Sequence, residues 1–390
     1  MDILYIAASP WDSMLQRSQA IAIELAREAR VLYVNSTLLS VLGAVRRIVR
    51  GESPARPGIH EVQKNLMVLD LAPGPLPGGC HVHAFTRGEL WWASLQLRRW
   101  VEKLRFRDYI LWFATPWAAH LADHLDPLLV CYDCVDNMPA FFPPGRQRAL
   151  VRDLEQWLIA RADVVFATSD QLRTVCLALN PDVHLVRNGV WSARYAHAEP
   201  APDVATFPCP VLGYVGSVGY WIDQEVIARL AERFSSGSVV IVGPVDVDVS
   251  RLRPYRNVHF LGRKPHREMP AYIQAFDVGL IPFADGELTA AVDPVKFYEY
   301  CAAGKPIVVS GLPELERYRG LCYLAESPAA FVSRVEEALT ETTDRKLSEA
   351  LAQRRRALAR ENSWETRGAR ICGILEGYSR PSLDKVAVFQ

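Results

Sequence analysis

The sequence has neither a net charge nor a long apolar run. Its 390 residues include 44 Lys and Arg against 44 Asp and Glu, so its charge does not predict a protein that coats nucleic acid, and no nucleic-acid partner is expected. No apolar run reaches the roughly 18 residues of a membrane span. Asp2 stands where a signal peptide needs a basic residue. We therefore expect a globular protein of the cytoplasm.

The cysteines are few and scattered, and no metal site is predicted. The eight cysteines lie mostly inside apolar runs, which is typical of reduced intracellular thiols. Cys131 and Cys134 form a C-x-x-C, but no second pair exists and no helix opens directly after them, so buried thiols are favoured. His120 and His124 have an H-x-x-x-H spacing, yet Leu121 stands where a zinc protease has Glu.

Short apolar runs alternate with helical patterns along most of the chain. No G-x-G-x-x-G follows the first run, which disfavours a dehydrogenase. Continuous apolar runs between helices predict parallel strands buried on both faces, and hence an α/β fold of doubly wound sheets. The strands are expected at residues 3–7, 31–34, 66–71, 109–113, 128–132, 164–167 and 183–186, and then at 211–215, 239–242, 258–261, 278–282 and 307–309.

The length predicts two to three domains. Residues 1–199 are expected to form a first Rossmann-like domain, and the proline-rich residues 200–210 a linker. Residues 211–362 form the second domain, with helices near 223–233, 267–276 and 294–303. Residues 363–390 are expected to be a helix that packs back on the first domain, followed by a tail. Two such sheets predict a ligand cleft between their carboxyl ends.

The run Asp293 to Pro306, DPVKFYEYCAAGKP, carries strong helix boundary signals. Asp293 is a typical N-cap and Pro294 fits the first helical turn. Gly304 suits the left-handed position after the helix, and Pro306 prevents its continuation. We therefore expect a short helix with well-defined ends.

The amino end of this helix predicts an anion site. Because Pro294 has no N–H, the free donors of the first turn would come from Val295, Lys296 and Phe297, and the helix dipole and the Lys296 charge would add to them. Glu299 lies one turn deeper on the same face and could accept hydrogen bonds from ribose hydroxyls. The pattern predicts a nucleoside-diphosphate site. The alternative is a surface helix with an i,i+3 pair between Lys296 and Glu299.

At this point the sequence resembles a known family. The runs FLGRKPHREMPAYIQAFDVGLIPF and DPVKFYEYCAAGKPIVVS are similar to the donor half of GT-B glycosyltransferases, in the retaining family-four-like group of teichuronic-acid and exopolysaccharide enzymes. The runs PVLGYVGSVGYWID, VVFATSDQL, LVRNGV and SPWDSMLQRSQ also resemble that group. The resemblance implies two Rossmann-like domains with a central cleft and a C-terminal crossover helix.

The same resemblance implies a hexosyltransferase-like function. A sugar would move from a UDP- or GDP-linked donor to a saccharide or lipid-linked acceptor, with retention, in surface polysaccharide biosynthesis. It would need no cofactor and no metal, since no D-x-D motif of the kind used by metal-dependent transferases stands at a strand end. Two other functions stay open, a non-catalytic nucleotide-sugar-binding scaffold and a sugar-nucleotide epimerase.

The resemblance also assigns roles in the donor half. Glu299 corresponds to the ribose-binding Glu, and Gly216 and Ser217 to the loop near the donor phosphates. Arg263 and Lys264 would lie along the nucleobase; their alternative is a solvated basic loop.

The donor half departs from the family pattern at two places. Ala291 stands where many members have a further Glu, eight positions before Glu299, and Gly219-Tyr220-Trp221 replaces the usual Lys-Gly. We expect Lys296 to supply the missing cation and to stabilise the leaving diphosphate. Asn188-Gly189-Val190 resembles the family's N-G-V turn, with a geometric role.

In the first domain, three residues after the first strand are candidates for the acceptor side. Trp11, Arg17 and Gln19 could serve as stacking platform, phosphate ligand and hydroxyl ligand; a structural role is the alternative for Trp11. Asp133 and Asp136 follow a predicted strand. We expect Asp136 as the first candidate, and Asp133 as the second, to orient the acceptor or the oxocarbenium-like centre. Asp136 matches the family's Asp at this place; helix N-capping is the alternative for Asp136.

A basic stretch predicts contact with an anionic membrane. Residues 30–107 hold twelve Lys and Arg against five acidic residues. LLSVLGAVRRIVRG and ELWWASLQLRRWVEKLRFR mix apolar residues, Trp and Arg at helical spacing, which suits a peripheral position at the inner face of the plasma membrane. The alternative is a core helix with its Arg stems on the rim.

Overall fold

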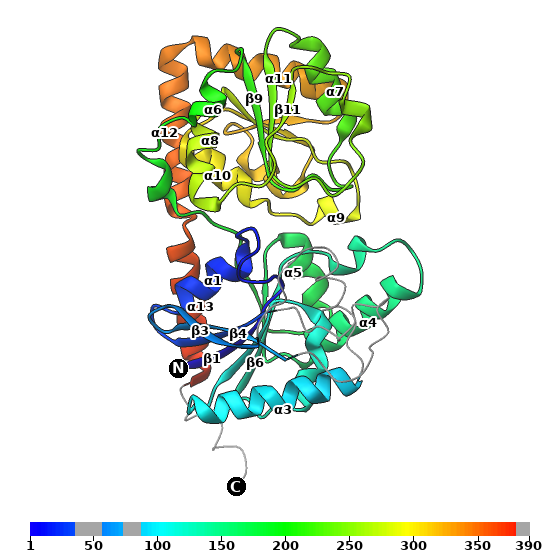
Figure 1. Ribbon diagram of the computed structural model, residues 1–390, viewed down its shortest axis with the longest axis vertical. Helices are drawn as coiled ribbons and strands as arrows, with labels where there is room; N and C mark the ends of the chain where they lie inside the picture. The colour runs from blue at the N-terminus through cyan, green and yellow to red at the C-terminus, as the bar shows by residue number, and fades with distance from the viewer. Residues whose placement is uncertain (36–56, 73–86, 380–390) are drawn as a thin grey trace. The chain divides into compact units, whose positions relative to one another are not determined.

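The computed structural model describes residues 1–35, 57–72 and 87–379. They form two compact units (Figure 1). Unit 1 comprises Met1–Thr168, Leu172–Val186 and the chain from Glu365 onward, and unit 2 comprises Ser169–Gln171 and Arg187–Trp364. Within the described ranges, no helix is both long and apolar enough to cross a membrane.

Unit 1 is built on one sheet with the strand order β3-β4-β2-β1-β5-β6-β7-β8. All neighbouring strands are parallel except β3 and β4, which are antiparallel. The strands are β1 Asp2–Ile6, β2 Arg30–Val34, β3 Gly58–Gln63, β4 Leu66–Asp70, β5 Ile110–Phe113, β6 Leu129–Cys134, β7 Val164–Ala167 and β8 Val183–Leu185. The sheet order reverses between β1 and β5, as in doubly wound folds.

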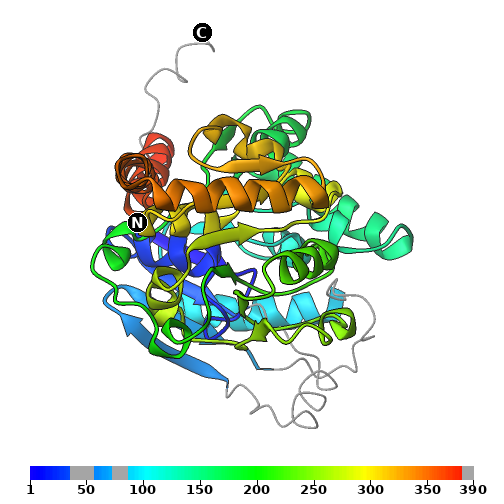
Figure 2. The same ribbon diagram turned by 90° about the horizontal axis from the view of Figure 1, so that it is seen from above.

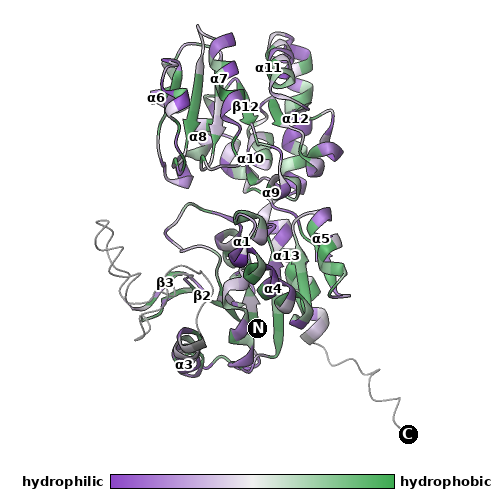
Figure 3. Cartoon of the chain, turned by 90° about the vertical axis from the view of Figure 1, so that its right-hand side faces the viewer, coloured by the Kyte–Doolittle hydropathy of each residue, from purple (hydrophilic) through white to green (hydrophobic). Residues whose placement is uncertain are grey.

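The helices of unit 1 follow the expected alternation with strands. They are α1 Arg17–Leu25, α3 Arg87–Lys103, α4 Arg146–Arg161, α5 Asp170–Leu177 and α13 Trp364–Ser379, with short 3-10 helices η1 Pro116–Asp123 and η2 Met138–Phe141. Apolar strands such as β5, whose residues are all buried, explain why this alternation was readable from the sequence. Figure 3 shows strands of both sheets as largely hydrophobic, whereas the helices carry hydrophilic faces.

Unit 2 is a six-stranded, fully parallel sheet with the order β11-β10-β9-β12-β13-β14. Numbered within the unit, this is the 3-2-1-4-5-6 order of the Rossmann fold, and its switch point lies between β9 and β12. The strands are β9 Val211–Val215, β10 Ser238–Val242, β11 Val258–Phe260, β12 Val278–Ile281, β13 Ile307–Ser310 and β14 Tyr323–Ala325.

Helices cover this sheet closely. They are α6 Pro202–Ala205, α7 Gln224–Arg233, α8 Met269–Gln274, α9 Glu287–Ala290, α10 Val295–Ala303, α11 Pro328–Thr343 and α12 Arg345–Glu361, with 3-10 turns η3 Ser192–Tyr195, η4 Ser250–Leu252, η5 His266–Glu268 and η6 Pro313–Tyr318. The helix α11 packs across β12, β13 and β14 (Figure 2), and α12 packs along α10. A Cβ at Gly279 of β12 would lie 2.7 Å from the Tyr300 ring, so glycine lets α10 approach the sheet.

The boundary between the units differs from the expected one. Residues 200–210 are not a free linker, because α6 lies there and Val204 is buried in the core of unit 2. Unit 2 already takes in the chain from Arg187, since Val190 and Tyr195 belong to the same core. The apolar pattern of residues 187–199 was too short to reveal this. The helix α13 belongs to unit 1 from Glu365 onward.

Candidate active site in unit 2

The helix α10 begins one residue later than the sequence predicts. Pro294 is its N-cap, and the helix ends at Gly304, which has a left-handed φ of 77°. The expectation that Asp293 caps this helix is wrong. Its carboxylate accepts hydrogen bonds from the Asn188 backbone N–H at 2.6 Å and from the Tyr298 hydroxyl at 2.8 Å. A partner more than a hundred residues earlier thus competes successfully with local capping.

The turn at Asn188 therefore fixes the start of α10. The Asn188 side-chain amide donates to the Asp293 carbonyl at 2.5 Å, in addition to the backbone bond. A Cβ at Gly189 would lie 2.9 Å from the Asn362 carbonyl oxygen, so only glycine fits there. The geometric role predicted for the N-G turn agrees with these contacts.

The first turn of α10 offers fewer free donors than predicted. The Phe297 N–H donates to the Pro294 carbonyl at 3.0 Å, so it is already used within the helix. Because Pro294 itself has no N–H, the Val295 and Lys296 amides remain the candidates for an anion at this end.

The Lys296 side chain lies at the switch point of the sheet. Its Nζ lies 4.7 Å from the centre of the Phe283 ring and 5.3 Å from that of Tyr214. Tyr214 belongs to β9, and Phe283 follows the end of β12 by two residues. A crevice outside the carboxyl ends of the two strands flanking a switch point is where ligands of such sheets bind. The Lys296 ammonium therefore lies near the carboxyl ends of β9 and β12, the two strands that flank the switch point.

Gly216 lies against the same lysine. A Cβ at Gly216 would meet Lys296 Cε at 3.2 Å and the Tyr214 hydroxyl at 3.0 Å, and its φ is 131°. The Tyr214 hydroxyl also donates to the Ser217 carbonyl at 2.9 Å, which holds the loop after β9 in place. Gly216, Ser217 and Lys296, which were predicted to share the phosphate end of the donor, do lie together.

Glu299 is buried on the next turn of α10. It is 7% exposed, and its Oε1 accepts from the Tyr195 hydroxyl at 3.0 Å and lies 3.1 Å from His266 Nε2. Burial raises the pKa of the Glu299 carboxyl, but the hydrogen bond and charge of His266, together with the charge of Lys296, hold this pKa below its ordinary value. The carboxylate is therefore ionised at neutral pH.

The two partners of Glu299 were missed at the sequence level. His266 stands two residues after Lys264 in the run that carries the resemblance, and Tyr195 lies in η3. Both bonds that the described residues make to Glu299 use Oε1, which leaves Oε2 to accept from a ligand hydroxyl. The signal for His266 was its position in the motif, whereas nothing local pointed to Tyr195.

The predicted nucleobase residues have different surroundings. Arg263 is exposed, and Lys264 is half-buried. Lys264 Nζ lies 3.6 Å from the Asp203 carboxylate and 5.3 Å from the centre of the Tyr272 ring. Ala291, which replaces a family Glu, follows α9 and is 1% exposed, so a methyl group fills the protein interior there.

Two candidates of unit 1, Arg17 and Asp133, are buried in its interior. Arg17 and Asp133 are 2% and 0% exposed and form a bidentate ion pair, with Arg17 Nη2 at 2.8 Å from Asp133 Oδ1. Asp133 was expected after the strand, but β6 runs on to Cys134, so its side chain is buried. Arg17 and Asp133 therefore bind each other, and the structure does not present them as separate ligands.

Gln19 and Trp11 shape the loop after β1. Gln19 is 2% exposed, its Nε2 donates to the Pro10 carbonyl at 3.2 Å and its Oε1 accepts from the Gln16 N–H at 3.0 Å. Trp11 is half-buried. Its ring packs edge-on against the Tyr33 ring, with the two ring centres 5.0 Å apart. This contact favours the alternative, a structural role for Trp11.

Asp136 is half-buried at the carboxyl end of β6. The N-cap position of the following 3-10 helix η2 is occupied by Asn137, the residue after Asp136. Glu155 of α4, which the sequence did not single out, lies within the electrostatic reach of Asp136 and accepts from the Tyr132 hydroxyl at 2.7 Å. Burial raises the pKa of Glu155 to about 7, and the charge of Asp136 adds to this increase.

The sequence of this chain is similar to those of known proteins. The family model described as "Glycosyl transferases group 1" matches residues 209–341, which include Gly216, Lys296 and Glu299. The chain is also 28% identical over 276 residues to the putative teichuronic acid biosynthesis glycosyltransferase TuaH of Bacillus subtilis strain 168, covering 65% of this chain and 68% of that protein. The chain is a glycosyltransferase.

Solved structures agree on the fold. The sucrose-phosphate synthase of Thermosynechococcus elongatus superposes with a TM-score of 0.73 at 14% identity, over 96% of this chain and 98% of that one. Anabaena Alr3699/HepE in complex with UDP and glucose gives a TM-score of 0.66 at 15% identity, over 97% and 100%. The glycosyltransferase thus has the GT-B fold, as the sequence predicted.

Among the described residues of this glycosyltransferase, no three His, Cys, Asp or Glu side chains gather as a metal site would require. Cys131 and Cys134 are buried free thiols.

Proposed function

We infer that this glycosyltransferase transfers a sugar, with retention, from a UDP- or GDP-linked donor to a saccharide or lipid-linked acceptor in surface polysaccharide biosynthesis. The observation that carries the proposal is the position of Lys296 at the switch point of unit 2, one turn from the ionised Glu299. The relative TuaH is described as a teichuronic acid enzyme, and the structural neighbour HepE was solved with UDP and glucose. The first supports a role in polysaccharide biosynthesis, and the second supports a UDP-linked donor.

In the proposed site, positive charge stabilises the leaving diphosphate. The Val295 and Lys296 amides and the Lys296 ammonium would face its oxygens, and the preorganised amino end of α10 adds its dipole. Glu299 Oε2 would accept from a ribose hydroxyl while His266 holds the carboxylate in place. This arrangement needs no metal ion and no bound cofactor, because Lys296 and the amino end of α10 supply the positive charge that balances the negative charge on the leaving diphosphate.

On the acceptor side, we assign Asp136 the role of orienting the acceptor or the oxocarbenium-like centre. Glu155 beside it, with its pKa near 7, can share or relay a proton at neutral pH. The buried ion pair between Arg17 and Asp133 stabilises the carboxyl end of β6. We therefore assign both residues a positioning role.

A nucleotide panel tests the donor assignment. Because a ligand that binds only the folded protein raises its melting temperature, UDP-sugars or GDP-sugars are expected to stabilise the wild-type protein by several degrees. Glu299→Ala should lose most of this shift, since the ribose loses its acceptor. Glu349→Ala, on the exposed surface of α12, is the matched control and should keep the shift. A full shift in Glu299→Ala would contradict the ribose assignment.

The reaction itself is tested with the stabilising nucleotide sugar. Product analysis with a saccharide or lipid-linked acceptor should show transfer, and NMR of the new anomeric centre should show the configuration of the donor. Inversion at this centre would overturn the proposal of retention. Release of an epimerised nucleotide sugar without acceptor would favour the epimerase alternative.

Contact with an anionic membrane belongs to the same proposal, through α3. Leu90, Ala93 and Leu97 face the core of unit 1, whereas Trp91 is 56% exposed and Arg99 is exposed as well. The helix therefore combines the predicted core face with an outward Trp and basic side chains. The other predicted segment, residues 38–51, lies outside the described residues.

Vesicle binding tests this surface. The wild-type protein is expected to sediment with vesicles of phosphatidylglycerol and less with phosphatidylcholine. Since a basic residue near such a surface contributes about 1 kcal/mol, Arg99→Gln should weaken binding about fivefold, and Trp91→Ser should weaken it further. Arg345→Gln, which removes an exposed charge of unit 2, is the control. Equal binding to both lipids would contradict membrane contact.

A further inference from the structure

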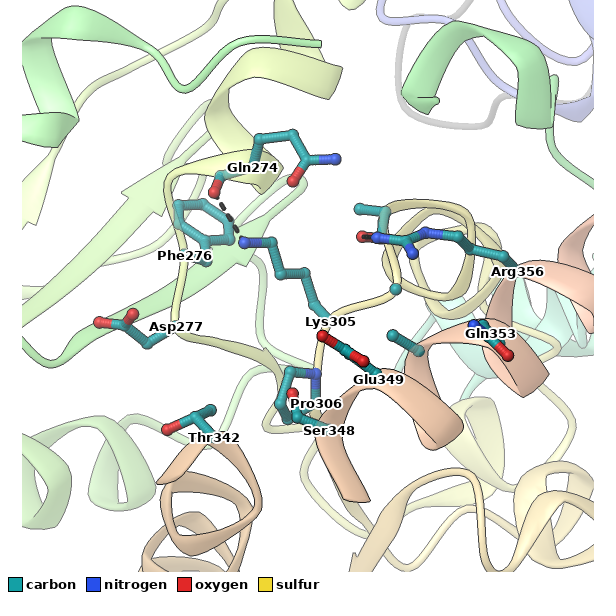
Figure 4. A pocket seen from close by; sticks show the side chains of 13 residues that line it. Gln274, Phe276, Asp277, Lys305, Pro306, Thr342, Ser348, Glu349, Gln353 and Arg356 are labelled. Atoms are coloured by element: carbon teal, nitrogen blue, oxygen red, sulfur yellow. Dashed lines mark hydrogen bonds between the residues drawn. The ribbon is translucent and has the colours of Figure 1, made fainter. Parts of the chain in front are cut away.

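A pocket of about 340 Å³ lies in unit 2 at the carboxyl ends of α8 and α10. Its walls come from α8 and the segment between α8 and β12, from the turn between α10 and β13, and from α11 and α12 (Figure 4). Lys305, the residue after the left-handed Gly304, reaches into it. The volume is at the lower end of the range for small-molecule sites.

The Lys305 amine is held at one point only among the described residues. Its Nζ donates to the Gln274 carbonyl at 2.7 Å, the dashed line in Figure 4, and thereby satisfies the carboxyl end of α8. Lys305 is one of the residues that line the pocket, and it is half-buried. A small reagent in the pocket can therefore meet the nitrogen.

Charges around the pocket act on Lys305 in opposite directions. Burial lowers the pKa of the Lys305 ammonium to about 8; the Asp277 carboxylate opposes this change and the Arg356 guanidinium adds to it. The remaining acid of the lining, Glu349, is paired with Arg345 at 3.0 Å. An ordinary lysine has a pKa of about 10.4, so Lys305 carries roughly two hundred times more neutral amine at pH 7.

We propose that Lys305 is a site of covalent acylation, at which the amine lining this pocket takes an acyl group from an acyl phosphate. In this step the neutral Nζ attacks the acyl carbon, the N–C bond forms, and the C–O bond to phosphate breaks. The phosphate leaves with the bonding electron pair, and the proton of the attacking amine goes to solvent. The product amide keeps one N–H for the Gln274 carbonyl but has no charge for Asp277.

Acylation of Lys305 would also affect the helix α10, which lies next to the pocket. Lys305 stands two residues after the last residue of α10, the helix whose amino end carries Lys296. Arg356 of α12 donates to the Ala303 carbonyl of the same helix at 3.3 Å. Loss of the Lys305 charge therefore changes the electrostatics at the carboxyl end of α10.

Acetylation of the wild-type full chain with acetyl phosphate, followed by peptide mass spectrometry, tests the proposal. Lys346, exposed at the start of α12, is the internal reference. At pH 7, Lys305 is expected to react about tenfold faster than Lys346, since its lower basicity and partial burial offset part of its larger neutral fraction. Its rate should level off above about pH 8, whereas that of Lys346 keeps rising.

Two substitutions of Arg356 sharpen the test. Arg356→Gln removes a repelling charge, so acetylation of Lys305 at pH 7 should slow a few-fold, and Arg356→Lys, which keeps the charge, should retain the wild-type rate. Thermal melting checks that both variants fold. The proposal is overturned if Lys305 reacts no faster than Lys346 at pH 7, or if its rate rises in parallel with that of Lys346 up to pH 10. Because no readout depends on sugar transfer, failure of the proposed function would leave this test intact.

Discussion

Replacing Lys296 with methionine is expected to lower kcat/KM for sugar transfer by a hundredfold or more. The methionine side chain can keep the packing against Phe283 and Tyr214, but it removes the full positive charge at the switch point. Loss of one such preorganised group costs about 10²–10³ in rate when charge develops in the transition state. Steady-state kinetics with the donor identified by the nucleotide panel measure the effect.

Lys346→Met is the matched control, because it removes a lysine from the exposed surface of α12. It should leave kcat/KM within a factor of two. Lys296→Met should also lose the thermal stabilisation by nucleotide, since the diphosphate loses its counter-charge in the ground state. If Lys296→Met keeps both its rate and its nucleotide shift, the phosphate assignment is wrong.

Replacing Arg17 with methionine is expected to destabilise unit 1 by about 3–5 kcal/mol. Asp133 is 0% exposed, and Arg17 supplies its bidentate partner at 2.8–3.0 Å. Without the guanidinium, a carboxylate charge stays buried without compensation. Urea unfolding followed by circular dichroism and tryptophan fluorescence should show the first transition at a clearly lower midpoint.

The double variant Arg17→Met/Asp133→Leu separates the pair from simple loss of packing. It removes both charges and replaces them with apolar side chains of similar size, so most of the lost stability should return. A single variant as stable as the wild type would show that water or another group already compensates Asp133.

The sequence predicted the bounds of α10 to within one residue, and its carboxyl end depends on local chemistry. Gly304 and Pro306 end the helix through their own backbone restrictions, whereas its start also depends on the distant Asn188. The position of Lys296 followed from the same local rules. The parallel sheets were equally predictable, since buried strands such as β5 and β7 are apolar throughout.

The predictions were wrong for residues whose contacts come from distant parts of the chain. Asp293 has the residue type of an N-cap, but Asn188 and Tyr298 bind its carboxylate, and only the folded chain brings Asn188 there. Asp133 and Arg17 are separated by 116 positions in the sequence, so neither residue alone reveals that each neutralises the other. His266 and Tyr195 meet at Glu299 for the same reason.

The contacts of the segment that follows Arg187 decide how this enzyme can be divided for experiments. A fragment cut at the proline-rich stretch near residue 205 would lack Asn188, which fastens the start of α10, and Tyr195, which holds Glu299. Such a truncated protein would retain Gly216, Lys296 and Glu299 and yet lose contacts that hold two of these elements, the start of α10 and Glu299, in place. Expression of unit 2 alone therefore has to begin at or before Arg187.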